Sequence, residues 1–514
     1  MWAKDNSRDS PNVYWLFGSA GSGKSTIAYT IARRFEFAGD SNDTIILGGN
    51  FFCSRQFEET RLSKYIIRTI AYHLALTCKP FADALHRSGN FITKDHSIKT
   101  QIENLLVKPW PWKEPGSAQR RDPSVPPHPD SSVSSHQNPP MPPLNYLIVI
   151  DALDEIDGNG GSDFLRNLLN VVNKHRLPGL KFFVTSRSDP GLVSDVEKFE
   201  RKHHYHLQNV NEEEIRHDIA IYINANFSEN LDRSQVEVLV MLSGGLFIYA
   251  TTVVKYLKTC GRSEQQDFLA ELLPTASSLM PRLLSDATSF TLLDTLYLQV
   301  LRQAFRDFTP QTPKWVTQPR ILHTFLCTAD WTSASVIADL LFTSDYTDVA
   351  DKLLSDLHAV LYTEDGRVLA YHKSFADFIF DQSRSDDFWC NQATHHRLLT
   401  DSCFRVMNAK DGLRFNIAKI SSSFMLDRDD STLPDAVKTN ISAVLSYSCR
   451  NWGHHIYSTT WTTSDHLCNT LADFLEIRAL FWIEVMNLLG MRGRCGPILR
   501  TAREWVVKSG VSVL

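Results

Sequence analysis

The nine residues Gly18-Ser19-Ala20-Gly21-Ser22-Gly23-Lys24-Ser25-Thr26 constrain this chain more than any other stretch of its sequence. They fit the pattern GxxxxGK(S/T), in which glycines let the backbone wrap so that successive N–H groups point at phosphate oxygens. An apolar run over 12–17 precedes this phosphate loop, and apolar residues at helical spacing follow it over 27–35. The pattern therefore predicts a strand, a phosphate-binding loop and a helix. In that setting Lys24 would reach the β- and γ-phosphates, and the Ser25 hydroxyl would ligate Mg²⁺.

A second polar site is predicted where the apolar run Leu147-Ile148-Val149-Ile150 ends in Asp151. A parallel sheet would deliver this carboxylate beside the phosphate loop, where it could serve as a further Mg²⁺ contact. Asp154 and Glu155 follow, and one of them could polarise a water for attack on the γ-phosphate. The alternative interpretation is an ordinary acidic loop at the end of a strand.

A third apolar run, over 181–185, ends in Ser186 and Arg187. Arg187 could sense the γ-phosphate from a neighbouring strand, and the alternative is a solvated arginine without a role. Helical spacing over 62–76 and 164–174, with strand-like pieces at 44–47 and 50–53, completes an alternation of strands and helices. This order predicts the α/β class, with a parallel sheet covered by helices on both faces.

A proline-rich stretch over 109–145 interrupts that α/β pattern. Half of the 22 prolines of the chain lie between Pro109 and Pro143, among Ser, His, Asp and Gln. Such a composition has too little apolar surface to offset its ordering entropy, so we expect a disordered insertion.

Helical patterns dominate beyond residue 210. The uncharged run 238–254 has Ser243-Gly244-Gly245 at its centre, which favours two buried helices over a membrane span. Apolar runs on either side of Glu364-Asp365-Gly366 predict a hairpin within a small winged-helix unit, and 471–489 is the strongest amphipathic stretch near the end. A chain of 514 residues is too long for one core. We expect a nucleotide-binding domain over 1–210, a helical domain over 211–285, a winged-helix domain over 286–385 and a helical region over 386–514.

Composition excludes some function classes and places the chain in a compartment. The formal net charge of −5 argues against a chain built to bind nucleic acid. The nine cysteines are dispersed, with no CxxC pair, which indicates buried thiols in a reducing, cytoplasmic setting rather than a zinc or disulfide framework. Two groups of histidines have no cysteine or carboxylate at metal-ligand spacing. For His203, His204 and His206, a solvated loop is favoured over a metal site. For His395-His396, a metal site is likewise unsupported.

Three motifs in this order resemble the NACHT nucleotide-binding domain of STAND signalling P-loop NTPases, relatives of NOD-like receptors. They are the phosphate loop, the stretch 147–155 that reads LIVIDALDE, and the stretch 182–187 that reads FFVTSR. Among NACHT proteins, the chain most resembles the fungal nephrocystin type. The stretches 51–55, 67–71, 245–250 and 372–378 are also similar to these proteins. The resemblance covers roughly residues 12–385.

The resemblance implies roles for individual residues. Lys24 and Ser25 match the phosphate and Mg²⁺ positions, Asp151 the Mg²⁺ aspartate, and Asp154-Glu155 the acidic pair of these domains. Arg187 matches the sensor arginine. His372 matches a winged-helix histidine that touches the β-phosphate of ADP in the closed state.

The function implied is an ATP/ADP-dependent switch with Mg²⁺, slow hydrolysis as a reset and homo-oligomerisation on activation, in fungal innate immunity or non-self recognition. The sequence does not decide whether the nucleotide is ATP or GTP, and it does not name the protein partners. Family members usually carry effector and repeat domains that this sequence does not show. The alternatives are a small-molecule P-loop kinase and a non-catalytic scaffold or remnant of a larger receptor.

Overall fold

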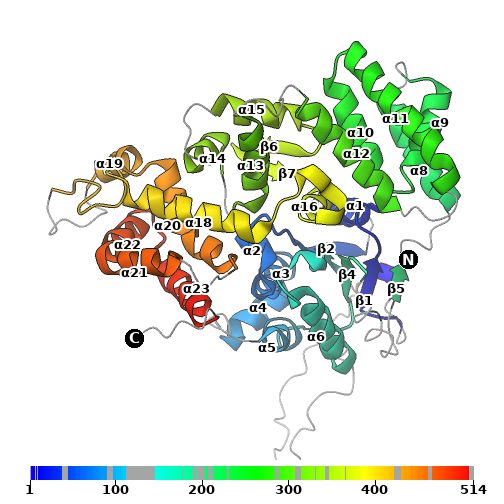
Figure 1. Cartoon of the computed structure of the whole chain (residues 1–514). Helices are drawn as coiled ribbons and strands as arrows, with labels where there is room; N and C mark the ends of the chain where they lie inside the picture. The colour runs from blue at the N-terminus through cyan, green and yellow to red at the C-terminus, as the bar shows by residue number, and fades with distance from the viewer. Residues whose placement is uncertain are drawn as a thin grey trace, which may run out of the picture. The chain divides into compact units, whose positions relative to one another are not determined.

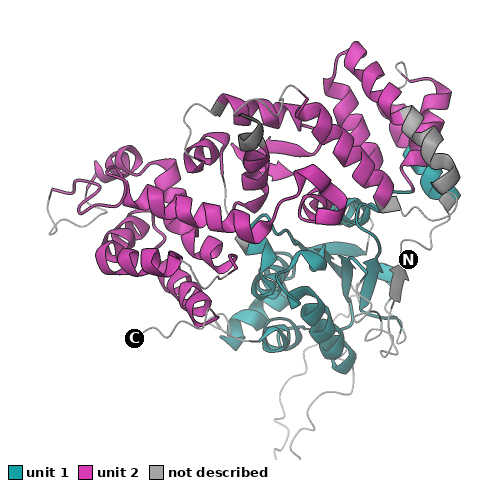
Figure 2. Cartoon of the chain, viewed as in Figure 1, with its two compact units in different colours: residues 1–219, 245–247 teal, residues 220–244, 248–514 magenta. Residues whose placement is uncertain are grey.

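The computed structural model describes most of the chain, in segments that include the phosphate loop and the predicted acidic loop. The described residues are 2–5, 7, 10–36, 44–89, 97–111, 145–175, 177–188, 193, 203–206, 212–227, 231–283, 289–306, 314–329, 332–341, 347–364, 366–421, 430–460 and 466–508. Most of the predicted proline-rich insertion, residues 112–144, lies outside them, as does Asp365 of the predicted hairpin turn. The chain forms two compact units, one of residues 1–219 with 245–247 and one of residues 220–244 with 248–514 (Figure 2).

A five-stranded parallel sheet forms the centre of the first unit, in the order β2-β3-β4-β1-β5 (Figure 1). The strands are β1 (Val13–Phe17), β2 (Ile45–Phe52), β3 (Asn145–Asp151), β4 (Leu180–Ser186) and β5 (His203–His206). β1 therefore lies between β4 and β5 although it comes first in the chain, and each neighbour is reached through a crossover. The predicted α/β class and parallel sheet are confirmed.

Alternating side chains of the strands enter two separate cores, one on each face of the sheet. Ile148 and Val184 lie in one core with the helices α3 to α6, whereas Leu147 and Val149 lie in the other with Ala28 of α1. Apolar residues at both odd and even positions are what a parallel sheet covered on both faces requires. The helical elements of this unit are η1 (Trp2–Lys4), α1 (Lys24–Glu36), α2 (Glu58–Arg61), η3 (Ser63–Tyr65), α3 (Ile66–Thr77), α4 (Lys79–Ser88), α5 (Ile98–Ile102), η5 (Glu103–Val107), η6 (Leu153–Glu155) and α6 (Gly160–Lys174).

The edge strand β2 differs from its prediction as two separate pieces. It is one strand whose pairing with β3 shifts register between Leu47 and Gly49. A Cβ added at Gly48 would lie 2.8 Å from Leu74 of α3, so the absence of a side chain lets the irregular backbone approach the helix. The apolar signal is interrupted there, but the strand continues through the irregular pairing.

Helices make up most of the rest of the chain (Figure 1). They are α8 (Glu212–Phe227), α9 (Arg233–Leu242), α10 (Phe247–Thr259), α11 (Arg262–Leu283), α12 (Ser289–Ala304), α13 (Lys314–Cys327), α14 (Ala334–Leu340), α15 (Thr347–Asp356), α16 (Lys373–Ile379), α17 (Gln382–Ser385), η9 (Asp386–Phe388), α18 (Gln392–Asn408), α19 (Leu433–Asn440), α20 (Ala443–Tyr457), α21 (Leu467–Ile477), α22 (Ala479–Leu488), η11 (Arg492–Arg494) and α23 (Cys495–Lys508). The uncharged run 238–254 contains the end of α9 and most of α10, so the prediction of two helices is confirmed. Among the described helices, none has both the length and the apolar composition that crossing a bilayer needs.

The hairpin predicted around Gly366 is present. β6 (Leu361–Glu364) pairs antiparallel with β7 (Arg367–Ala370), and α13, α14 and α15 precede it in the chain. The winged-helix assignment and the finer domain boundaries stay predictions.

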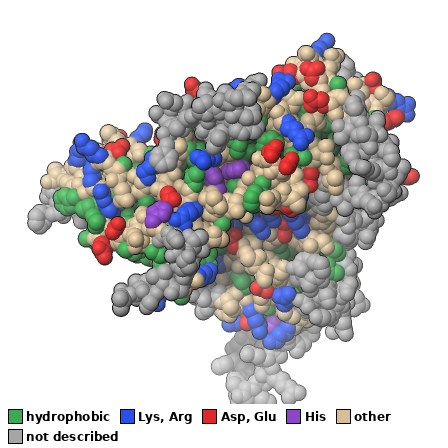
Figure 3. Space-filling view, viewed as in Figure 1, with side chains coloured by type: hydrophobic (Ala, Val, Ile, Leu, Met, Phe, Trp, Pro, Cys, Tyr) green, Lys and Arg blue, Asp and Glu red, His purple; other side chains and the backbone are tan. Residues whose placement is uncertain are grey.

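The amphipathic stretch 471–489 is divided between two helices, α21 and α22, instead of forming one. The break falls at Arg478, whose guanidinium donates to the Leu413 carbonyl and holds the turn in place. Around this break Ile477 and Leu480 are exposed. Figure 3 shows apolar side chains on part of the surface at the left of the view. The break turns part of the apolar stripe outward, which periodicity alone does not indicate.

Candidate functional site

The strand order brings three polar segments to one edge of the sheet. β4 lies between β3 and β1, so the carboxyl ends of these three strands are neighbours. The phosphate loop follows β1, Asp151 ends β3, and Arg187 follows β4. In open parallel sheets, ligands bind outside the carboxyl ends of strands at a point where the strand order reverses, as it does between β4 and β1.

The phosphate loop needs glycine at two of its positions. Gly21 and Gly23 have φ of 75° and 89°, in the region that other residues rarely adopt. A Cβ at Gly23 would also lie 3.8 Å from the Phe247 ring, so this ring, at the start of α10, lies beside the loop. α1 begins at Lys24, and the N–H groups of a first helical turn have no partner within the helix. The loop therefore presents backbone donors and the positive end of a helix dipole at the same place.

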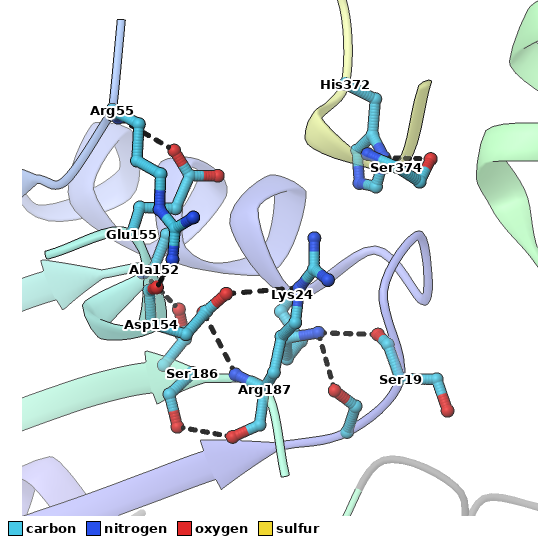
Figure 4. A network of polar contacts seen from close by, with 12 residues as sticks. Ser19, Lys24, Arg55, Ala152, Asp154, Glu155, Ser186, Arg187, His372 and Ser374 are labelled. Atoms are coloured by element: carbon cyan, nitrogen blue, oxygen red, sulfur yellow. Dashed lines mark hydrogen bonds and ion pairs between the residues drawn. The ribbon is translucent and has the colours of Figure 1, made fainter. Parts of the chain in front are cut away.

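Lys24 places a buried ammonium inside this loop, with only 8% of the residue exposed. Its Nζ donates to the carbonyl oxygens of Gly18 at 2.9 Å and Ser19 at 2.6 Å (Figure 4). The Ser22 hydroxyl donates to Ser19 as well, at 2.8 Å, and so holds the loop closed. Burial lowers the pKa of Lys24 to about 8, a fall that nearby Asp154 and Asp151 oppose and Arg187 assists. The group is thus a cation whose charge is costly unless an anion lies close to it.

Asp151 is the most buried carboxylate of the site, with 4% exposed. Thr185 of β4 donates its hydroxyl proton to Asp151 Oδ1 and accepts from the Ala152 N–H at 2.9 Å. Ala152 has φ of 54°, so the chain turns sharply after β3 and this N–H meets the threonine. Burial raises the pKa of Asp151, while hydrogen bonds from Thr185 and Ser25 and the charge of Lys24 oppose that rise.

Asp154 and Arg187 form an ion pair across the ends of β3 and β4. Arg187 Nε lies 3.1 Å from Asp154 Oδ2, and the Arg187 N–H donates to Oδ1 at 3.0 Å (Figure 4). Both carboxylate oxygens of Asp154 therefore hold the segment that carries Arg187. The predicted water-activating carboxylate and the predicted sensor arginine lie together, and the aspartate is bonded to the arginine.

Glu155 lies against a different segment. Its Oε2 accepts from the Arg55 N–H at 3.1 Å, and Arg55 Nη2 donates to the Asp154 carbonyl at 3.1 Å (Figure 4). Cys53, just past the end of β2, donates its N–H to the Asp151 carbonyl at 3.0 Å. Burial and then the neighbouring Asp151, Glu155 and Asp154 raise the pKa of the Cys53 thiol well above its ordinary value. The acidic loop is therefore anchored from both sides, by β2 and by β4.

Close packing by α6 holds the acidic loop in position. A Cβ added at Gly161 would lie only 1.9 Å from the Leu153 carbonyl oxygen. The first turn of α6 therefore rests directly on the backbone of η6, which contains Asp154 and Glu155. The sequence shows a glycine here without showing why it is needed.

The donor set of the site suits a hard divalent cation. The Ser25 hydroxyl is a neighbour that lowers the pKa of Asp151, so the two oxygen donors expected to ligate Mg²⁺ lie close together. Mg²⁺ favours few protein oxygens together with phosphate oxygens and waters. The residues present therefore fit this ion beside a phosphate chain.

His372, in the second unit, is the first residue before α16. Its Nδ1 accepts from the Ser374 N–H at 3.1 Å, and Tyr297 OH lies 2.7 Å from Ser374 Oγ. Because Nδ1 accepts, the ring proton of neutral His372 is on Nε2. The predicted role of this histidine toward a phosphate stays a prediction.

The structure places the phosphate loop, Asp151, Asp154, Glu155 and Arg187 at one edge of one sheet. Sequence reasoning missed the residues that hold them there: Arg55, Thr185, Gly161 and Phe247. A threonine at the penultimate residue of β4 could have suggested a partner for the Asp151 carboxylate, since neighbouring parallel strands end together. The other three depend on long-range packing.

Comparison with known proteins gives one family match. The family described as "Nephrocystin 3, N-terminal" matches residues 1–111, which include the phosphate loop. No curated protein matches the chain. Together with the sheet order and the loop, the match supports a P-loop nucleotide-binding fold for the first unit.

Solved structures that resemble the chain include Walker-type and origin-recognition proteins. A Walker-type ATPase from Pyrococcus abyssi has 13% identity and a TM-score of 0.26, over 71% of this chain and 90% of that one. Aeropyrum pernix ORC2, in ADPNP and ADP complexes, has 12% identity and a TM-score of 0.28, over 78% and 90%. Drosophila ORC bound to DNA has 15% identity and a TM-score of 0.25, over 69% and 77%.

Proposed function

We propose that the first unit binds ATP and ADP together with Mg²⁺, and that the bound nucleotide sets the state of the protein. The observation that carries the proposal is the buried ammonium of Lys24 inside a loop of glycine-rich backbone, beside the paired Ser25 hydroxyl and Asp151 carboxylate. A diphosphate would exchange the Gly18 and Ser19 carbonyls for anionic oxygens as partners of Lys24. Charge-assisted hydrogen bonds of this kind are about twice as strong as neutral ones.

Each residue of the site has a task in this proposal. Backbone N–H groups of Gly18–Thr26 hold phosphate oxygens, Lys24 neutralises their charge, and Ser25 with Asp151 orients the cation side of the phosphates. When bound, Mg²⁺ supplies charge neutralisation between the terminal phosphates. Thr185 keeps the Asp151 carboxylate turned toward Ser25.

Hydrolysis in this proposal is slow and resets the switch. Glu155 is the carboxylate that orients the attacking water, because both oxygens of Asp154 already hold Arg187 and its backbone. Asp154 is a positioning residue that aims the arginine at the γ-phosphate. This division of labour refines the prediction that either carboxylate could polarise the water.

The wider switch follows from the resemblance to NACHT proteins. We propose that His372 recognises the β-phosphate of ADP in a closed state, and that ATP favours a state in which nucleotide domains associate into a homo-oligomer. Moving such an equilibrium from 1:99 to 99:1 takes about 5.5 kcal/mol of differential binding. The proton on His372 Nε2, fixed by the Ser374 N–H, supports a donor role toward a phosphate. A setting in fungal innate immunity or non-self recognition is part of the same proposal.

The first test is whether nucleotide binds at the phosphate loop. Titration calorimetry with Mg-ATP and with ADP should show binding to the wild type, and about 100-fold weaker binding to Lys24→Ala. Lys181→Met is the matched control, since Lys181 is also buried with a lowered pKa but bonds to Ser10 and Pro11 near the other end of the sheet. Nucleotide affinity that falls equally in both variants, or in neither, would remove the loop as the site.

The second test concerns the closed state. His372→Ala should weaken ADP about fivefold more than ATP, because only the ADP state is proposed to use this side chain. The measurement is the ratio of the two affinities by calorimetry, with Tyr297→Phe as the control that removes a buried hydroxyl from Ser374 and leaves the imidazole. An equal loss for both nucleotides would exclude the proposed discrimination.

A further inference from the structure

We propose that His323, Cys327, Cys390 and His395 of the second unit form a zinc site with two thiolate and two imidazole ligands. None of these residues takes part in the nucleotide site proposed above, so this inference stands or falls by itself. We call these four residues the thiol–imidazole cluster.

Two short segments bring the four side chains together. His323 and Cys327 are four residues apart on α13, and side chains at this spacing lie on the same face of a helix. Cys390 lies between η9 and α18, and its N–H donates to the Ile379 carbonyl at 2.9 Å. His395 follows in the first turn of α18. One helix face thus meets the start of another helix, which is how many closed zinc sites are assembled.

The distances are close to those of a tetrahedral site. One ligand atom each of His323, Cys390 and His395 lies within 4.8 Å of the others. The sulfurs of Cys327 and Cys390 are 3.9 Å apart. Zinc–sulfur bonds of about 2.3 Å at tetrahedral angles would separate two thiolates by about 3.8 Å. Small side-chain rotations would therefore close the cluster around an ion.

Hydrogen bonds at Nε2 of both rings leave the lone pair on Nδ1. Thr324 donates its hydroxyl proton to the Arg320 carbonyl at 2.7 Å, so at 2.9 Å from His395 Nε2 it accepts the ring N–H. His323 Nε2 lies 3.0 Å from the Phe388 carbonyl oxygen, which can only accept. Both rings therefore carry their proton on Nε2, and Nδ1 is unprotonated. Ligating histidines in proteins show this same arrangement, in which the second ring nitrogen donates to a neighbouring oxygen.

A second histidine cluster, beginning one residue further along α18, behaves differently. His396 Nδ1 is bonded to His455 Nδ1 at 2.9 Å, and His455 Nε2 to Tyr447 OH at 2.8 Å. Both nitrogens of His455 are therefore hydrogen-bonded to other side chains. The thiol–imidazole cluster differs from this second group because it combines an unprotonated Nδ1 on each of two rings with two sulfurs.

Burial and donor type point to zinc. Cys327, Cys390 and His395 are 4%, 1% and 7% exposed, so four protein ligands would enclose the ion and leave little room for water. A mixed sulfur and nitrogen set with tetrahedral distances is typical of structural Zn²⁺, whereas Mg²⁺ and Ca²⁺ take oxygen ligands.

The test uses the full chain purified under reducing conditions without added chelator. Elemental analysis should find about one zinc per chain. After removal of zinc with a chelator, added Co²⁺ should give thiolate-to-cobalt charge-transfer absorption and the intense visible bands of a tetrahedral ion. Re-addition of Zn²⁺ should raise the melting temperature, since a ligand that binds only the folded state stabilises it.

Variants separate ligation from general packing. Cys390→Ser and His395→Gln should each lose the bound zinc and the cobalt spectrum, and Thr324→Val should weaken zinc about tenfold because it frees the His395 ring. Cys403→Ser is the matched control: this cysteine lies on α18, is fully buried and has Ser448 rather than the cluster as its partner. It should keep the full zinc content.

Three outcomes would overturn the proposal. The first is wild-type protein that holds no zinc and gives cobalt spectra without a thiolate band. The second is a Cys327–Cys390 disulfide found by mass spectrometry of the reduced preparation, because that bond would use both sulfurs. The third is zinc lost equally from Cys390→Ser and Cys403→Ser, which would indicate a packing effect.

Discussion

The phosphate loop and the thiol–imidazole cluster both bury polar groups, but they satisfy them in opposite ways. Lys24 bonds to carbonyl oxygens five and six residues earlier in its own loop. In the cluster, Cys327 meets Cys390 across 63 residues of sequence and Thr324 meets His395 across 71. The loop is thus built from contiguous backbone, whereas the cluster exists only once α13 and α18 have packed. Substitutions that strain the local backbone should therefore damage the nucleotide site. Substitutions that weaken the packing of α13 against α18 should damage the cluster.

The largest expected effect comes from Gly161→Ala, which introduces a steric clash against the acidic loop beside the phosphate loop. The added methyl would collide with the Leu153 carbonyl, so we expect about 3 kcal/mol of destabilisation and displacement of the acidic loop. Nucleotide affinity should fall with it, while the metal content of the cluster stays unchanged. Denaturant unfolding and calorimetry measure the two effects.

Gly158→Ala is the control for Gly161→Ala. A Cβ there meets nothing within 4 Å, but φ is +58°, so only a dihedral cost of about 1 kcal/mol is expected. Equal destabilisation by the two substitutions would show that α6 does not press on the acidic loop.

The next effect separates the two carboxylates of the first region. Glu155→Gln should slow hydrolysis about 100-fold while ATP stays bound, because it removes the group proposed to orient water. Asp154→Asn should slow it about tenfold and make turnover insensitive to Arg187→Ala, because the arginine has already lost its partner. Single-turnover hydrolysis measures both. Normal turnover in Glu155→Gln would move the water-orienting role to another residue.

The smallest effect is a pH dependence of nucleotide affinity at the phosphate loop. Lys24 has a pKa of about 8 in the folded chain, below its ordinary 10.5, so it loses its proton as the pH rises through 8. Phosphate binding favours the charged form, and affinity for Mg-ATP should therefore be flat below that pH and fall up to about tenfold per unit above it. Calorimetry from about pH 7 to about pH 9.5 measures the slope.

The stability of the ligand-free fold should depend on pH with the opposite sign, through the same lysine. Below its lowered pKa, Lys24 carries a buried charge that destabilises the free fold. That cost shrinks as the pH rises from about 8 toward 10.5, where the unfolded chain still holds the proton. Lys24→Arg, which keeps its charge over this range, should bind with a flat profile. A fall of equal slope in this variant would assign the titration to another group.

The parts of the fold that the sequence predicts are those encoded by neighbouring residues. The motif around Gly21 and Gly23 predicts a loop because glycine tolerates positive φ. In the structure both glycines have positive φ. The unbroken apolar run 147–150 predicts a strand covered on both faces, and Ser243-Gly244-Gly245 predicts the break between α9 and α10. Each depends on backbone preference or on the period of apolar residues.

The parts that could not be predicted depend on contacts between distant segments. The dispersed cysteines and the pair His395-His396 indicate no metal site along the sequence, because the spacing that matters is created by α13 meeting the start of α18. The pairing of Asp154 with Arg187 is likewise invisible before β3 and β4 lie side by side. The break at Arg478 depends on a carbonyl 65 residues away. Periodicity describes one helix or strand at a time and carries no information on such meetings.

The position of Thr185 on β4 links the register of the sheet to the ability of the site to bind a ligand. A slip of β4 by one residue against β3 would present Val184 or Ser186 to Asp151 instead of the threonine, and would carry Arg187 away from Asp154. A misaligned sheet would thus be unable to hold its ligand, whatever its stability. A bound small molecule would then stabilise only those chains whose strands are correctly aligned, and would increase their share of the folded population.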